Sequence, residues 1–210
     1  MKLDKQGKLE QFPPINGVYK RKDGRWFMRP DAQSEGAELP EDMARQIRLD
    51  LRIERRMGNP LNYKSRAFHN EIDCHQTALR AIGMGDSARN LFRFPNERFK
   101  TFQSLDETTS YIRDAVGKKM GLAQIKGSAE MIWHSFLTGV DELGRIICFE
   151  RGTGEDSSFY VVLFEDIYKS YESYAEREMY GVIMFPIYWA VGPVDEIKQS
   201  SLTQTAKIKK

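Results

Sequence analysis

The order of the predicted elements favours an α+β fold, in which helices come first and mostly antiparallel strands follow. Residues 40–57 and 73–83 have helical patterns, whereas residues 131–140, 145–150 and 159–163 have the apolar and β-branched character of strands. With 210 residues, 40% of them hydrophobic, the chain is long enough for one main core. No internal repeat interrupts this order.

The first 60 residues are predicted to be an N-terminal extension made of an arm, a hairpin and a helix. Residues 1–16 are polar and contain a Pro-Pro pair, which is typical of an extended arm. Two short apolar runs within residues 18–28 flank Asp23-Gly24, a strong hairpin signal.

Capping signals predict where two of the helices begin and end. The helix over residues 40–57 has Pro60 in the segment that terminates it. A second helix begins after Ser104, which forms a capping box with Glu107, and ends at Gly117. The stretch 84–103 is predicted to be irregular.

The C-terminal half is predicted to be mainly strands. After the strand over residues 159–163, a helical run continues to about Glu176, and an apolar strand follows over 181–190. We expect the main domain to span residues 61–195 and a flexible tail to span 196–210.

Composition excludes several classes of partner. The 32 basic and 30 acidic residues are nearly balanced, and acids interleave with the basic segments 20–25 and 45–56, which argues against nucleic acid. No apolar stretch has the length of a signal peptide or membrane span, so we expect a cytoplasmic protein, or one exported without a signal peptide, and no membrane partner. The two cysteines form no disulfide framework, and Cys148 is expected in the core.

Cys74 is the candidate nucleophile. Asp73 is a good N-cap and Gly83 a good stop, so Cys74 lies in the first turn of a short predicted helix. The positive end of a helix dipole favours the thiolate form of a cysteine, which is the nucleophilic form.

His134 is the candidate base for this thiol. It interrupts the otherwise apolar predicted strand 131–140, and a histidine in such a position is a candidate for acid–base chemistry. His75 adjoins Cys74 on the same helix and points about a hundred degrees away, so we expect it to be badly placed to take the thiol proton. His69 is expected to be a surface or pocket-wall residue.

The register of the next hairpin decides whether Glu150 joins this site. A three-residue loop with Gly144 in the left-handed position places Glu150 on the same face of the sheet as His134. A four-residue loop places the two residues on opposite faces. In the first register Glu150 accepts a hydrogen bond from the imidazole and holds it for Cys74; alternatively, Arg151 neutralises the carboxylate.

These residues resemble the papain-like fold of cysteine peptidases and amidases, and most closely the NlpC-type and CHAP-type amidohydrolases. Asp73-Cys74 is similar to their Asp-Cys at a helix start, and His134 is similar to their strand histidine. Glu150 falls where CHAP-type members carry a third carboxylate or amide.

The resemblance spans residues 70–165 at most and implies N-terminal helices, with the nucleophile at a helix start, packed on an antiparallel sheet that carries the histidine. The chain departs from the pattern in two places. His75-Gln76 follows the nucleophile where small residues are usual, and Trp133 precedes the histidine where glycine is usual.

The sequence does not single out an oxyanion donor or a metal site. An oxyanion donor besides the Cys74 amide is needed, and the side chains that lie upstream for this role are Asn62, Tyr63, His69 and Asn70. A metal site built from His69, Asp73, Cys74 and His134 matches no compact ligand spacing, so we expect neither metal nor cofactor.

The sequence therefore predicts a cysteine hydrolase that uses Cys74, His134 and Glu150 to cleave a peptide, isopeptide or peptidoglycan-like amide through an acyl-enzyme. One alternative is a non-catalytic α+β binding domain in which the same residues are merely packed. A second is a papain-like deamidase or acyltransferase effector, which keeps the nucleophile but changes the acceptor.

Overall fold

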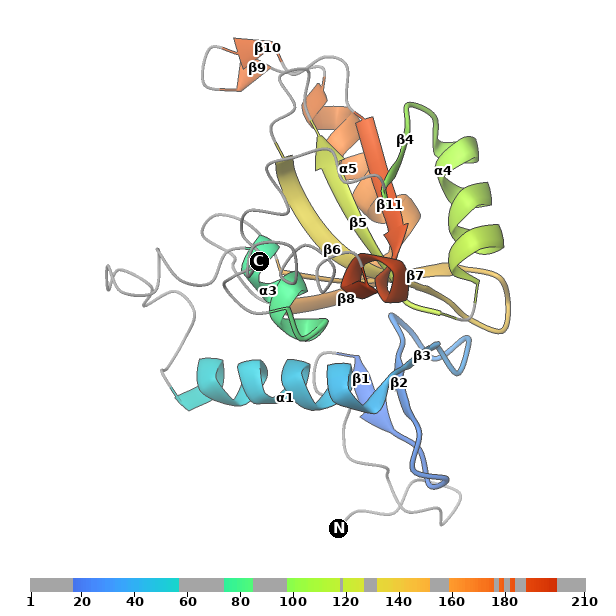
Figure 1. The fold of residues 1–210 in the computed structure, drawn as a ribbon, viewed down its shortest axis with the longest axis vertical. Coiled ribbons are helices and arrows are strands. Elements are labelled where there is room, and N and C mark those ends of the chain that lie inside the picture. Colours follow the sequence, from blue (N-terminus) through green and yellow to red (C-terminus); the bar gives the residue numbers. More distant parts are fainter. Residues whose placement is uncertain are drawn as a thin grey trace, which may run out of the picture.

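The computed structural model describes residues 17–56, 74–84, 98–117, 119–126, 132–151, 159–175, 178–179, 182–183 and 188–199. Its centre is a six-stranded sheet with antiparallel neighbours (Figure 1). In spatial order the strands are β4 (Lys100–Phe102), β11 (Tyr188–Pro193), β5 (Gly121–Lys126), β6 (Ile132–Val140), β7 (Ile146–Arg151) and β8 (Phe159–Leu163). The predicted α+β class is confirmed.

Helices cover both faces of this sheet. They are α1 (Glu41–Arg56), α3 (Cys74–Ala81), α4 (Leu105–Tyr111) with its π-helical continuation η3 (Ile112–Val116), and α5 (Phe164–Ala175). One core cluster joins α1 and α3 to Leu137 and Phe149 of the sheet. A second joins η3 and α5 to Phe136 and Cys148, the neighbours of those residues along β6 and β7. Because successive strand residues point to opposite faces, both faces of these strands are buried.

The N-terminal strands belong to the same core as α3. The strands β1 (Val18–Lys20), β2 (Trp26–Met28) and β3 (Ala37–Leu39) form an antiparallel sheet that lies with α1 below the main sheet in Figure 1. Val18 and Met28 are fully buried and share one apolar cluster with Leu137 of β6. The described part of the extension thus contributes to the main core.

Several predicted boundaries are confirmed. The Asp-Gly pair forms the β1–β2 turn, with Gly24 at φ +89°, and α1 begins and ends within one residue of the predicted helix. The side chain of Ser104 accepts a hydrogen bond from the Glu107 amide at 3.2 Å, and Gly117 follows the π-helical turn with φ +53°.

Other elements differ from the sequence prediction. β3 and β5 are additional strands, and β4 lies inside the stretch 84–103 that was expected to be irregular. The strand expected over 181–190 is divided: β10 (Val182–Ile183) pairs with β9 (Glu178–Met179), while β11 continues to Pro193 in the main sheet. Residues 194–199 are helical and Ile197 is buried, so packing continues past residue 196, where the flexible tail was expected to begin.

The β6–β7 hairpin adopts the three-residue loop. The Asp141 amide donates to the Arg145 carbonyl at 3.0 Å, and Gly144 has φ +77°. Val140 faces Ile146, and the same register continues to the facing pair of Leu137 and Phe149. The register that places His134 and Glu150 on one face is therefore confirmed.

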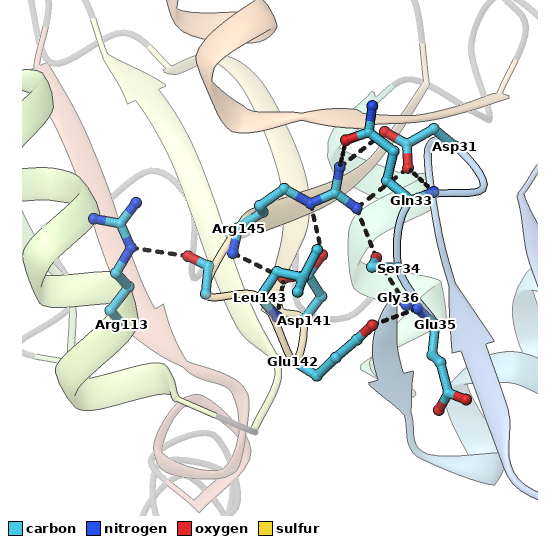
Figure 2. Close-up of polar contacts among 11 residues, drawn as sticks. Asp31, Gln33, Ser34, Glu35, Gly36, Arg113, Asp141, Glu142, Leu143 and Arg145 are labelled. Atoms are coloured by element: carbon cyan, nitrogen blue, oxygen red, sulfur yellow. Dashed lines mark hydrogen bonds and ion pairs between the residues drawn. The ribbon is translucent and has the colours of Figure 1, made fainter.

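Arg145 fastens this hairpin to the N-terminal sheet (Figure 2). Its guanidinium donates to Asp141 at 2.8 Å, to Asp31 at 2.9 and 3.2 Å, and to Ser34 at 2.6 Å. The Asp141 side chain is fully buried and that of Arg145 is 20% exposed. Removing one partner of such a pair leaves a buried charge without compensation, which is costly.

Within the described segments, no helix combines the length and apolar character needed to cross a bilayer.

We expect Arg145→Ala to lower the free energy of unfolding by about 1–3 kcal/mol, because it removes the charged partner of the buried Asp141 carboxylate and leaves it with Ser34 and two backbone amides. Urea denaturation followed by circular dichroism measures this change. Arg113→Ala is the matched control, since the exposed Arg113 side chain donates to Gly144 of the same loop (Figure 2) and should cost less than about 0.5 kcal/mol. Equal losses in the two variants would contradict the proposed role of Arg145.

Candidate functional site

Cys74 is the first residue of α3 and is 6% exposed. Its helix packs against β6 and β7, and its buried residues Ala78, Leu79 and Ala81 belong to the same apolar cluster as these strands. The predicted N-cap, Asp73, lies outside the described residues. The position of the cysteine in the first helical turn is as the sequence predicts, and amides at such a turn point their N–H groups toward an incoming anion.

His134 lies on β6 with its ring almost fully buried, at 1% exposure. The ring stacks on Tyr171 of α5, with centroids 5.7 Å apart and planes 20° from parallel. It also lies 5.6 Å from the Phe136 ring, on the face of the sheet that α5 covers. These aromatic contacts fix the orientation of the imidazole.

Glu150 of β7 holds one nitrogen of this imidazole. The His134 Nε2–H donates to Glu150 Oε2 at 2.7 Å, and the Glu150 side chain is 17% exposed. A short bond between a buried ring and a carboxylate fixes the tautomer of a neutral imidazole and stabilises its protonated form. The alternative partner, Arg151, has a side chain that lies outside the described part of the chain.

The thiol of Cys74 acts on the same imidazole. Within the described residues, Nδ1 of His134 makes no hydrogen bond of ordinary geometry, yet the thiol is close enough for the two groups to shift each other's pKa. The structure therefore brings together the three residues that the sequence singled out, in the order thiol, imidazole and carboxylate.

These contacts favour the charged forms of both groups. Burial alone would raise the pKa of Cys74, but contacts with His134 and His75 outweigh it and lower that pKa to about 6. Burial alone would lower the pKa of His134, but contacts with Cys74 and Glu150 raise it to about 9. Between about pH 6 and 9 the pair is thus a thiolate and an imidazolium.

Sequence reasoning missed the role of His75. Its Nδ1 lies 2.7 Å from Oγ of Ser135, the residue that follows His134 on β6, and its ring helps to lower the pKa of Cys74. The expectation that His75 is badly placed to take the thiol proton stays a prediction, but its effect on the pKa of Cys74 was not foreseen. The hundred-degree angle between successive side chains of an ideal helix does not account for the hydrogen bond that His75 makes with Ser135 on β6.

The remaining candidates from the sequence are Cys148, the upstream oxyanion donors and a metal site. Cys148 is fully buried in the core as expected, and burial raises the pKa of its thiol well above the ordinary value. The upstream oxyanion candidates Asn62, Tyr63, His69 and Asn70 lie outside the described residues. Among the described side chains, no group of three or more His, Cys, Asp or Glu residues is arranged to hold a metal ion.

Comparisons with protein families, with curated proteins and with solved structures find no match for this chain. Any function must therefore be argued from the geometry of the site.

We expect Glu150→Gln to lower the pKa of His134 from about 9 by about 1–2 units, because the amide keeps the size of the carboxylate but not its charge. Long-range ¹H–¹⁵N NMR of the imidazole follows this titration. An unchanged His134 pKa would contradict the electrostatic role of Glu150.

Direct titration is the appropriate measurement, because Cys74 and His134 change the free energy of unfolding with pH in opposite directions. The raised pKa of His134 gives stability that is complete below about pH 6.5 and is lost as the pH rises through about 9. The lowered pKa of Cys74 gives stability that is present above pH 9.0 and is lost as the pH falls through about 6. Between these limits the two slopes oppose each other.

Proposed function

We propose that this chain is a papain-like cysteine hydrolase that cleaves an amide bond, with Cys74 as nucleophile and His134 as acid and base. Glu150 orients the imidazole and stabilises its charge. The observation that carries the proposal is the 2.7 Å bond from buried His134 to Glu150, with the helix-start thiol acting on the same ring. A thiolate paired with an imidazolium is the activated form of a cysteine nucleophile.

The first half of the reaction forms an acyl-enzyme. The thiolate attacks the carbonyl carbon, a C–S bond forms, and the carbonyl oxygen takes the negative charge. The backbone N–H of Cys74, in the first turn of α3, donates to that oxygen. The His134 imidazolium then gives its proton to the amide nitrogen, the C–N bond breaks, and the amine leaves.

The second half restores the site with the same groups. Neutral His134 takes a proton from water as the water oxygen attacks the acyl carbon. The C–S bond breaks, the carboxylic acid leaves, and Cys74 returns as a thiolate beside an imidazolium. Glu150 keeps Nε2 occupied throughout, so the proton moves at Nδ1.

The substrate class follows from the nucleophile and the acid. An amine is a poor leaving group unless it is protonated, and a buried imidazolium supplies that proton. Peptide, isopeptide and peptidoglycan-like amides share this bond. A deamidase or an acyltransferase shares the first half-reaction and differs only in the leaving group or in the acceptor.

Alkylation by iodoacetamide across a pH series, read at Cys74 by peptide mass spectrometry, tests the activated thiolate. We expect Cys74 to react with a midpoint near pH 6. At pH 6.5 the His134→Ala variant should react about tenfold more slowly. Without the imidazole a much smaller fraction of Cys74 is thiolate, and this loss outweighs the higher intrinsic nucleophilicity of a thiol with a higher pKa. The buried Cys148 is the internal control and should react only in denaturant.

Labelling no faster than an ordinary thiol, with no dependence on His134, would overturn the hydrolase proposal and favour a binding domain. If the thiolate is present, peptides, isopeptides and peptidoglycan fragments are screened for cleavage with Cys74→Ala as the inactive control. Loss of the nucleophile should reduce any measured turnover by at least about a thousandfold.

A further inference from the structure

Two consecutive residues of α3 meet two consecutive residues of β6. Cys74 acts on His134, and His75 lies against Ser135, with Nδ1 and Oγ 2.7 Å apart. Because neighbouring strand residues point to opposite faces, His134 turns toward α5, whereas Ser135 turns toward the face on which α3 packs. The start of α3 thus contacts β6 at Ser135, and its first residue lies near enough to His134 for the two groups to shift each other's pKa.

Ser135 is a buried polar residue, at 1% exposure, and its cross-strand partner Gln124 is also buried. Buried hydroxyl groups require hydrogen-bond partners, and His75 supplies one for Ser135. The contact also fixes the ring of His75, a half-buried residue that directly follows Cys74 in the sequence. Ser135 therefore has a structural role, the hydrogen bond with His75, that an apolar strand residue could not fill.

We propose that His75, held by Ser135, is a second positioning residue for the Cys74 thiolate, contributed by α3 whereas His134 is contributed by β6. This inference rests on the proposed function, because it assigns a partner to the same nucleophile.

The charges around the thiol agree with this arrangement. His134 from β6 and His75 from α3 both lower the pKa of Cys74, with His134 the stronger of the two, and Glu150 from β7 acts through His134. Two imidazoles stabilise a thiolate more than one does, since each added cation or donor favours the anion. Loss of His75 should weaken this stabilisation but not abolish it.

The pH midpoint of Cys74 alkylation in the full chain tests the inference. We expect His75→Gln, which keeps a polar side chain without the imidazole, to raise the midpoint by about one pH unit. Ser135→Ala should raise it by a smaller amount, because His75 remains but is no longer held. Ser135→Thr restores the hydroxyl and should return the midpoint toward that of the unaltered chain.

Arg80→Gln is the matched control. It removes one positive charge from the last turn of the same helix, about 9 Å from Cys74, and should leave the midpoint unchanged. Circular dichroism melting curves of every variant separate a shift in pKa from a loss of folding, and the half-buried position of His75 makes its substitution the safest.

The outcomes distinguish this inference from the proposal on which it rests. An ordinary thiol midpoint in the unaltered chain overturns both. A midpoint near pH 6 that His134→Ala raises but His75→Gln does not would overturn the role of His75 and leave the hydrolase proposal intact. A shift in His75→Gln without one in Ser135→Ala would overturn the role of Ser135 as the residue that holds the ring.

Discussion

The register of the β6–β7 hairpin is the constraint on which the candidate site depends. Gly144, at φ +77°, permits the three-residue loop, and the Asp141 carboxylate accepts from the backbone amides of Leu143 and Arg145. A slip of one residue would reverse the face of every side chain on one strand. His134 and Glu150 would then lie on opposite faces, and the imidazole would lose its carboxylate.

The site is also a solution to a burial problem. The His134 ring is 1% exposed and is enclosed by Tyr171 and Phe136, an environment that disfavours an isolated charge. A carboxylate at Nε2 and a thiolate on the same ring compensate for the lost water. The thiol and the imidazole each favour the charged form of the other, so Cys74 and His134 titrate as a coupled pair.

Local signals in the sequence were enough for the elements that carry the site. Hairpin rules reduced the position of Glu150 to two registers, of which the structure adopts the one that places it beside His134, and capping signals placed Cys74 at a helix start. Long-range pairing was not predictable in the same way: β5 is a short strand held between β6 and β11, and β11 comes from the far end of the chain. The contact of His75 with Ser135 is likewise a product of packing between a helix and a strand, which residue spacing does not contain.

Residues of the site are packed on both faces of the main sheet. The helix that begins with Cys74 is packed in the cluster that includes α1 and the N-terminal strands, whereas His134 is packed against α5 on the other face. The Arg145 contacts join the N-terminal sheet to the hairpin that sets the register. The N-terminal strands thus share an apolar cluster with α3, and Arg145 joins their loop to the hairpin that includes the strand of Glu150. The segment that the sequence marks as an extension supports the geometry of both ends of the proposed triad.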